Sequence, residues 1–521
     1  MKNNAYRFYR PEWTVGRYNA EKHVAIMYNL IEGYSHFFES YSADVIGYVL
    51  AAGRNEEVKM SDIITGTGIS RDSIAPFFDT LIRVGLLTKR LYSPEEIAKY
   101  REEISRKRMS GGPQETKNNL DSVMTVSTAE QRYFQTIESN STIASVMFEL
   151  TYNCNEKCIH CYNPGATRND EEVSGRENRV ELVVSDYKRI IDELCEMGLV
   201  HVILTGGDPF VKAGIWEIID YLYQKELAFD IYTNGQKLFD KVDKLACFYP
   251  HLVGLSIYSG ESNSHDAITR VGGSWNKSIR LLEKLAEYSI ITNIKCCIMQ
   301  PNLHSYYSVK DLAEKYGAEV QYEVNITDSN DGDICARDLR LTEEQLSVVL
   351  MDRNISLFVG EGGRGYDIKK RNMDVKGCGA GDYSFCISPE GNLQPCCAFP
   401  MVLGNLKKQS VMGCITKNAI LEEWKSCTLR DYEECGTHEY CVCCNLCSGQ
   451  GYIEHGDYKK AAEGCCYLAK IRYGLNEKIR KGIDPLDGQS FQTALSRLPI
   501  KNNKLKRKYN NGINDASLPR L

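Results

Sequence analysis

The sequence contains no cysteine before Cys154, although the chain of 521 residues has 21. It also lacks an apolar run of the roughly 18 residues that suggest a membrane-spanning helix. The N-terminal stretch MKNNAYRFYRPEW has no apolar signal-peptide core. A formal net charge of −6 gives no general attraction to nucleic acid or to anionic membranes. These absences predict a cytoplasmic protein without nucleic-acid or membrane partners.

The cysteines are unevenly distributed. Eight lie between Cys154 and Cys335, and thirteen lie between Cys378 and Cys466. Without a secretory signal, a disulfide framework does not explain so many thiols, and metal or redox chemistry is the better interpretation. The chain is also too long for one ordinary core. We therefore expect several domains, with two metal-bearing regions after a metal-free one.

The first hundred residues predict helices and then a winged unit. The stretches 20–38 and 41–53 have helical apolar spacing, and 58–92 indicates helix, turn, helix and strand. Ser70 is a plausible N-cap of the second of these helices, whose buried face includes Phe78. This pattern is typical of a helix-turn-helix or winged-helix domain.

The function of this N-terminal unit is open between three interpretations. From Arg54 to Tyr92 there are six basic residues and five acidic ones, and this near balance gives little attraction to phosphate. DNA binding is therefore the weakest interpretation, behind docking of a peptide or protein and a purely structural cap. A polar helix over 93–108 and a breaker-rich loop end the unit.

Strands alternate with helices in the middle of the chain. The intervening helices imply a parallel sheet, either an open layer or an incomplete barrel, with a ligand site at the C-terminal ends of its strands. We expect a winged-helix-like unit over 1–110, an α/β barrel over 140–350, a cysteine-rich unit over 370–470 and a basic tail over 471–521. The predicted strands are 143–151, 199–207, 228–235, 252–259, 291–299 and 318–325.

Three cysteines follow the first of these strands in a C-x3-C-x2-C loop, at Cys154, Cys158 and Cys161. Three thiolates can hold three irons of a cubane cluster and leave the fourth iron open for a small ligand. The alternative is a structural zinc site with His160 as fourth ligand. Because His160 adjoins Cys161, ligation of one metal by both is awkward. The spacing therefore favours iron–sulfur, with His160 shielding the cluster.

The loop and the strand ends after it resemble the radical S-adenosylmethionine (SAM) superfamily. The second predicted strand ends in LTGGDPF, with Asp where that family usually has Glu, the third in YTNG, and the fourth in LSIYSGESNSHDAITRVGGSW. The resemblance implies a partial (β/α)6 TIM-like barrel, a [4Fe–4S] cluster on the three cysteines, and SAM as its ligand. It implies cofactor contacts from Gly206, Gly207, Asp208, Ser256 and Arg270, with Asn234 and Asn302 as weaker candidates.

This resemblance implies a definite reaction. SAM chelates the open iron, and one electron from the reduced cluster cleaves its carbon–sulfur bond. The products are methionine and a 5′-deoxyadenosyl radical, which removes a hydrogen atom from an unactivated position. The barrel positions the cofactor and keeps water and stray donors away. An electron donor such as flavodoxin or ferredoxin is an expected partner.

The second cysteine region resembles the SPASM domain, an extension of some radical enzymes that holds auxiliary [4Fe–4S] clusters. Cys378, Gly391 and Cys396 satisfy the first half of its pattern, C-x(9–15)-G-x4-C, and ISPEGNLQPC matches its hairpin. The second half is compressed to C-x2-C-x2-C, with Gly451 where the last cysteine is expected. Cys397, Cys435 or Cys443 is a candidate for the missing ligand.

The resemblance thus implies one or two auxiliary [4Fe–4S] clusters, with an uncertain ligand set for the second. A zinc ribbon is the alternative, because C-x2-C pairs are common in zinc sites, but it gives no reason for the motifs upstream. The candidate ligands in this region are Cys378, Cys386, Cys396, Cys435, Cys441, Cys444, Cys447 and Cys465.

The combination resembles maturases of ribosomally made peptides, as in bacteriocin and natural-product biosynthesis. It implies a precursor peptide whose leader is gripped by the N-terminal unit, and an intramolecular thioether or carbon–carbon cross-link. One alternative is a protein-modifying enzyme like the anaerobic sulfatase maturases, for which the N-terminal unit is dispensable. Another is a zinc-binding helix-turn-helix regulator, which predicts colourless protein and salt-dependent DNA binding. The sequence leaves the catalytic base, the precursor and the oligomeric state open.

Overall fold

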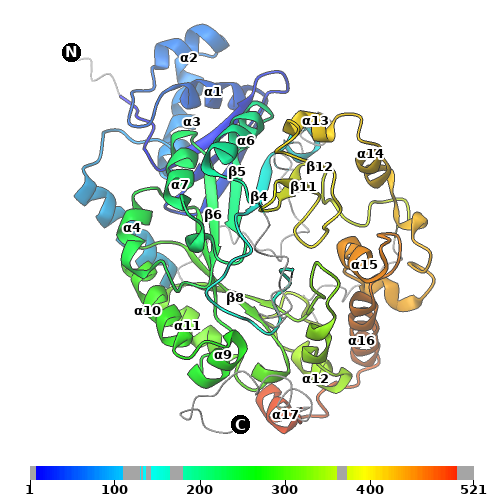
Figure 1. The fold of residues 1–521 in the computed structure, drawn as a ribbon. Coiled ribbons are helices and arrows are strands. Elements are labelled where there is room, and N and C mark those ends of the chain that lie inside the picture. Colours follow the sequence, from blue (N-terminus) through cyan, green and yellow to red (C-terminus); the bar gives the residue numbers. More distant parts are fainter. Residues whose placement is uncertain are drawn as a thin grey trace.

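A computed structural model describes residues 7–109, 130, 133–136, 142–164, 180–360 and 372–500 (Figure 1). In these residues the strands form two sheets, one of three strands and one of nine. The small sheet belongs to the N-terminal unit, and the large one combines strands from the middle and C-terminal parts of the chain. Within the described ranges, no helix is both long and apolar enough to cross a membrane.

The N-terminal unit begins with an antiparallel sheet in the order β1-β2-β3. Its strands are β1 (Thr14–Asn19), β2 (Val24–Asn29) and β3 (Tyr34–Glu39). The prediction of a helix over 20–38 is therefore wrong. Residues Val24 to Met27 are all buried, and such a continuous apolar run cannot be told from a buried helix by periodicity. Gly33, with a φ of +80°, lies in the turn before β3.

Four helices follow this sheet. They are α1 (Ser40–Ala51), α2 (Met60–Thr67), α3 (Arg71–Arg83) and α4 (Pro94–Met109). The predicted helix, turn and helix are present, and the Ser70 side chain accepts a hydrogen bond from the Ser73 N–H as the predicted N-cap. The strand predicted at the end of 58–92 is reduced to an isolated bridge between Tyr9 and Thr88.

Six neighbouring parallel strands of the large sheet confirm all six predicted strands. They follow one another in chain order. The strands are β4 (Ser145–Glu149), β5 (His201–Thr205), β6 (Ala228–Thr233), β7 (Leu252–Ser256), β8 (Thr292–Cys297) and β9 (Glu319–Glu323). The helices between them are α6 (Val184–Glu196), α7 (Ile215–Gln224), α8 (Val242–Ala246), α9 (Ser262–Thr269), α10 (Ser274–Glu287) and α11 (Ser308–Tyr316).

The predicted hairpin of the cysteine-rich region joins the same sheet. It consists of β10 (Ser384–Ile387), β11 (Asn392–Gln394) and β12 (Gly404–Asn405). β10 pairs in parallel with β4, with Ile387 opposite Phe148. The two units predicted over 140–350 and 370–470 are therefore continuous through one sheet of nine strands, whose end strands are β12 and β9.

The C-terminal helices are α12 (Glu343–Val349), α13 (Val411–Ile415), α14 (Ala419–Ser426), α15 (Ser448–His455), α16 (Glu463–Arg480) and α17 (Phe491–Arg497). In Figure 1 they follow the side of the molecule away from α1 to α3. The predicted basic tail does not start at 471, because Leu475, Leu495 and Leu498 are buried in the main core. The net basic composition of this segment hid the apolar residues that its helices bury. Residues 501–521 of that tail lie outside the described residues.

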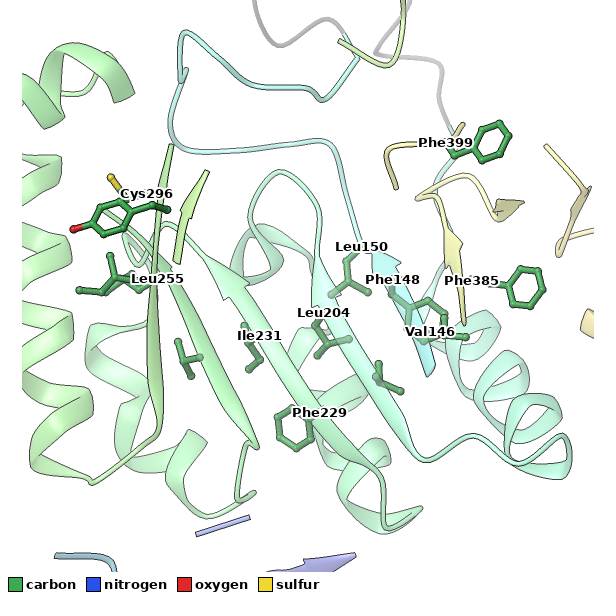
Figure 2. Close-up of a cluster of buried hydrophobic side chains, with 14 of the residues drawn as sticks. Val146, Phe148, Leu150, Leu204, Phe229, Ile231, Leu255, Cys296, Phe385 and Phe399 are labelled. Atoms are coloured by element: carbon green, nitrogen blue, oxygen red, sulfur yellow. The ribbon is translucent and has the colours of Figure 1, made fainter. Parts of the chain in front are cut away.

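The main core lies between the large sheet and its helices. Figure 2 shows that Val146 and Phe148 of β4, Leu204 of β5 and Ile231 of β6 line up along it, and that Phe385 of β10 extends it. Phe148 is fully buried. Truncation of such a side chain to Ala typically costs about 3–5 kcal/mol. The core therefore fixes the hairpin of the cysteine-rich region against the first parallel strand.

The N-terminal unit packs against the N-terminal ends of the parallel strands in the large sheet. Val24 and Ile26 of β2 share a buried cluster with Ala144 and Val200, which directly precede β4 and β5. Arg10 forms an ion pair with Glu226, just before β6. These contacts place the unit at the N-terminal ends of the parallel strands. The C-terminal ends, where ligands bind in such sheets, lie at the opposite edge.

Candidate metal and cofactor site

The C-x3-C-x2-C loop starts at the C-terminal end of β4 and is fastened to the end of β5. The backbone N–H of Gly207 donates to the Thr151 carbonyl at 2.6 Å, and the N–H of Asp208 donates to the Asn153 carbonyl at 3.1 Å. A Cβ atom on Gly207 would lie 2.1 Å from the Asn153 oxygen. Gly206 has a φ of +134°, which favours glycine. Both glycines thus let the cysteine loop approach β5 closely.

A second anchor holds the other half of the loop. The N–H groups of Lys157 and Ile159 each donate at 3.0 Å to the carbonyls of Thr269 and Ile268, at the C-terminal end of α9. Arg270 follows directly, with a left-handed φ of 57°. The loop is therefore clamped between β5 and α9, and the predicted cofactor residue Arg270 adjoins it.

The three thiols of the loop are close enough to affect one another's ionisation. Burial is the main cause that raises the pKa of Cys154 to about 12, and the charge of Cys161 adds to it. Burial also raises the pKa of Cys158, with Cys161 and Cys154 contributing. A group of thiols can be deprotonated together only beside a cation, and a bound metal deprotonates its thiol ligands. The donor set fits a cluster held by three protein ligands.

His160 lies beside this set rather than in the solvent. Its ring packs edge to face against Tyr258 with centroids 4.7 Å apart. Burial lowers the pKa of His160 to about 4, so the imidazole is neutral near pH 7. Its Nδ1 atom is buried and has no hydrogen-bond partner among the described residues. This position agrees with the predicted shielding role.

Asn234, at the end of β6, is a predicted cofactor residue whose side chain contacts the loop. Its Nδ2 donates to Cys154 Sγ at 3.3 Å and to Asn155 Oδ1 at 2.8 Å. Ser256, at the end of β7, hydrogen-bonds the hydroxyl of Tyr258 and lowers the pKa of that phenol, against a larger rise from burial. The C-terminal strand ends thus bring several predicted residues together.

Two of the predicted cofactor residues make structural hydrogen bonds. The Asp208 carboxylate is fully buried and accepts hydrogen bonds from the Thr233 hydroxyl, the Asn234 N–H and the Phe210 N–H at 2.6, 3.0 and 2.9 Å. It therefore fastens β5 to β6. Asn302 is also buried, and its Nδ2 donates to the carbonyls of Tyr258 and Cys297. Cofactor contacts of either side chain stay predictions.

A buried acid at the end of β4 was not predicted from the sequence. Glu149 is fully buried and accepts hydrogen bonds of 3.2 Å from the hydroxyls of Tyr152 and Tyr162. Burial raises the pKa of Glu149 to about 7, and Glu390 and Cys396 add to the rise. A carboxyl at the C-terminal end of a predicted strand was the available signal. Tyr162, directly after Cys161, donates to Glu149, and the charge of Cys396 acts on it.

The C-terminal cysteines separate into two sets. A cavity of about 100 Å³ is lined by four predicted ligands and by Cys466, which the prediction left out. The Cys443 Sγ instead accepts a hydrogen bond from Asn476 and does not line this cavity. For the adjacent residues Cys443 and Cys444, spacing in the sequence does not tell which thiol faces the cavity. The cavity cysteines are Cys435, Cys441, Cys444, Cys465 and Cys466.

The second set contains Cys378, Cys396 and Cys447. Burial raises the pKa of Cys447 to about 11, and Cys396 and Cys378 contribute. Two further thiols adjoin them. The Cys397 Sγ lies 4.0 Å from the Cys396 Sγ. Burial raises the pKa of Cys386 in β10, and the charge of Cys396 contributes to the rise. The chain thus offers one set of five thiols and one of three with two neighbours.

Comparisons with known proteins place a part of the chain among radical SAM proteins. Residues 148–304 match the family described as the Radical SAM superfamily. The mycofactocin maturase MftC of Mycobacterium tuberculosis is 28% identical over 360 residues, which cover 66% of this chain and 80% of that protein. The antilisterial bacteriocin subtilosin biosynthesis protein AlbA of Bacillus subtilis is 25% identical over 310 residues, covering 58% and 66%.

Two further comparisons bear on the fold. An AdoMet-dependent heme synthase of Methanosarcina barkeri is 26% identical over 348 residues, covering 62% of this chain and 96% of that protein. The crystal structure of Streptococcus suis SuiB bound to the precursor peptide SuiA is similar at a TM-score of 0.51 and 15% identity, covering 88% of this chain and 99% of SuiB. At this identity the similarity to SuiB shows a shared fold.

Proposed function

Residues 148–304 form a radical SAM domain, and from this premise we propose that the chain is a maturase of a ribosomally made precursor peptide. The domain uses a [4Fe–4S] cluster and SAM, which together supply an organic radical that removes a hydrogen atom. The Cys154 loop would hold the cluster, and Asn234 and Arg270 would orient the cofactor beside it. The product would be a peptide with an intramolecular thioether or carbon–carbon cross-link.

The observation that carries this proposal is the pairing of β10 with β4. Beyond this pairing, the Asn330 N–H donates to the carbonyl of Tyr162, directly after Cys161, and its Nδ2 donates to the carbonyl of Cys397, directly after Cys396. These bonds support a position of the Cys378–Cys396–Cys447 set beside the Cys154 loop, at the C-terminal edge of the parallel strands. Removal of one hydrogen atom leaves a radical, and cross-linking then requires loss of a second electron. An auxiliary cluster at that edge would accept this electron or bind a substrate thiolate.

The ligand sets of the auxiliary clusters follow from the same grouping. One cluster would use Cys435, Cys441 and Cys444, with either Cys465 or Cys466 as the fourth ligand. The other would use the Cys378–Cys396–Cys447 set, with Cys386 or Cys397 as the candidate fourth. A flavodoxin or ferredoxin in the cytoplasm would supply the first electron.

The N-terminal unit would grip the leader of the precursor. β3 pairs with β2 on one edge and has no strand partner on its other edge among the described residues, which suits addition of an extended peptide strand. The unit covers the N-terminal ends of parallel strands of five or six residues. At roughly 3.3 Å per residue these span about 17–20 Å. A docked precursor would therefore need at least about six extended residues before the modified position.

Turnover of the neighbouring precursor tests the proposal. The chain is purified without oxygen, reconstituted, and incubated with dithionite, SAM and a cysteine-containing peptide encoded beside it. We expect deoxyadenosine and a peptide that has lost two hydrogens. Cys158→Ala should abolish both products, and Cys396→Ala should leave deoxyadenosine but stop the peptide change. Cys247→Ala, at an exposed thiol outside both sets, is the matched control.

Strand addition at β3 has its own test. The N–H groups of successive residues point to alternate edges of a strand. Proline has no N–H, so one of the variants Ser35→Pro and His36→Pro removes a donor from the free edge, and the other removes a donor from the pairing with β2. The variant that keeps thermal stability should bind the precursor more weakly, with unchanged deoxyadenosine release in the absence of peptide. Equal precursor binding by that variant and the unsubstituted chain would refute docking at β3 and favour the sulfatase-maturase alternative.

A further inference from the structure

Three metal-ligating side chains meet at the end of the sheet opposite the cysteine loop. They are His201 at the start of β5, Asp230 in β6 and His251 just before β7. The Asp230 Oδ1 atom lies 3.3 Å from His201 Nε2 and 2.7 Å from His251 Nδ1. All three ligand atoms lie within 4.8 Å of one another. The radical chemistry proposed at the other end uses none of them.

Neighbouring groups fix the orientation of both rings. The second ring nitrogen of His201, Nδ1, lies 3.2 Å from the Ser145 hydroxyl. The other nitrogen of His251 hydrogen-bonds the Gly33 backbone. Metal-bound histidines are held in this way, with one nitrogen on the metal and the other on a hydroxyl, carbonyl or carboxylate. Both imidazoles are thus oriented toward the Asp230 carboxylate.

The arrangement suits a bound cation. If His251 donates its one proton to the Gly33 carbonyl, its Nδ1 lone pair faces the Asp230 oxygen at 2.7 Å, and two acceptors at that distance repel each other. A proton on Nδ1 or a metal ion removes the repulsion. Lys295 does not supply this positive charge, because its ammonium group donates to Gln321 and lies over the Tyr232 ring. A metal ion would take a lone pair from each imidazole as well as from Asp230, and all three ligand atoms are close enough together for this.

We propose that His201, Asp230 and His251 bind a divalent cation of the zinc type, with water as the fourth ligand. Two imidazoles and one carboxylate are donors that zinc prefers, and about 2.0–2.2 Å to each ligand is reached by small shifts of these side chains. Asp230 is 7% exposed, so the ion is largely screened from solvent. The site lies away from the thiols that hold iron.

The cation ties the N-terminal unit to the barrel. Tyr28 of β2 stacks on His201 with centroids 6.3 Å apart and meets His251 edge to face at 5.4 Å. Gly33, in the turn between β2 and β3, supplies the backbone contact to His251. A loaded site therefore joins three barrel strands to the β2–β3 hairpin, and it would fix the orientation of the unit proposed to dock the precursor.

Metal analysis of the reconstituted full-length chain tests this site. With the cysteine sets filled by iron, the unsubstituted protein should retain about one zinc ion per chain after dialysis. Asp230→Asn and His251→Gln should lose that zinc but keep their iron. His36→Gln, in β3 and outside the three-residue set, is the matched control and should keep both metals.

Two results would overturn the site. Absence of zinc from the unsubstituted chain, even after zinc is added, would show a proton-bridged His251–Asp230 pair instead. Zinc that persists unchanged in Asp230→Asn would show that it sits on cysteines. If both variants fold poorly, anomalous diffraction from the unsubstituted protein decides, because a zinc-edge peak is expected between these three side chains and a peak elsewhere refutes the proposal.

Discussion

The close approach of Gly207 to the cysteine loop predicts a large effect of one added methyl group. In Gly207→Ala the new Cβ would lie 2.1 Å from the Asn153 oxygen, whereas ordinary contacts begin near 3.4 Å. The loop must therefore move by more than 1 Å. Overpacking of this kind costs about 1–3 kcal/mol of folding stability, and a misplacement of about 1 Å near the chemistry can lower turnover about 100-fold.

The assay follows two quantities in the reconstituted protein, iron per chain and the rate of deoxyadenosine release. We expect Gly207→Ala to lose iron from the loop and to release deoxyadenosine about 100-fold more slowly. Gly474→Ala is the control, because that exposed position in α16 has no atom within 4 Å of an added Cβ. It should gain about 0.5–1 kcal/mol of stability. Full iron content and normal release in Gly207→Ala would refute the packing argument.

Three further variants test other contacts. Asp208→Asn replaces an acceptor oxygen with an NH2 group, so at least one of the three buried donors loses its partner. It should lose about 1–3 kcal/mol of stability in chemical denaturation and weaken SAM binding by freeing Asn234; unchanged affinity would contradict this link. Glu149 has a pKa of about 7 in the folded chain, above its ordinary value, so its favourable contribution at low pH is lost as pH rises toward 7. In Glu149→Gln the melting temperature should therefore fall less between pH 5 and pH 8, and an equal fall in both proteins would exclude a buried ionising Glu149. Ser70→Ala removes the cap on the Ser73 N–H and should cost about 1 kcal/mol in urea denaturation, with a smaller loss than about 0.5 kcal/mol counting against the cap.

The parallel sheet was predictable because most of its strands are short and apolar and alternate with helices that have one apolar face. In α6, for example, Tyr187, Ile190, Ile191 and Leu194 are the buried positions, and their spacing is helical. The strands over 24–39 were not predictable in the same way. Their apolar run between Val24 and Met27 carries no period-2 signal, because both faces of β2 are covered.

The candidate site was predictable where chemistry and spacing coincide, as in the Cys154 loop. It was not predictable where a side chain's task depends on its neighbours in space. Asp208 matches a cofactor motif, yet its carboxylate joins two strands. Cys466 lines the cavity while Cys443 does not, and the adjacent cysteines give no spacing signal for this difference. His201 and His251 belong to no motif at all.

The central claim is that the chain holds iron–sulfur clusters and cleaves SAM. It is tested most directly by anaerobic reconstitution, followed by measurement of iron, sulfide and zinc per chain and of deoxyadenosine after addition of dithionite and SAM. We predict about eight to twelve irons per chain, as expected for one or two auxiliary four-iron clusters beside the radical cluster, together with deoxyadenosine. Zinc on the cysteines in place of iron, with no deoxyadenosine, would contradict it.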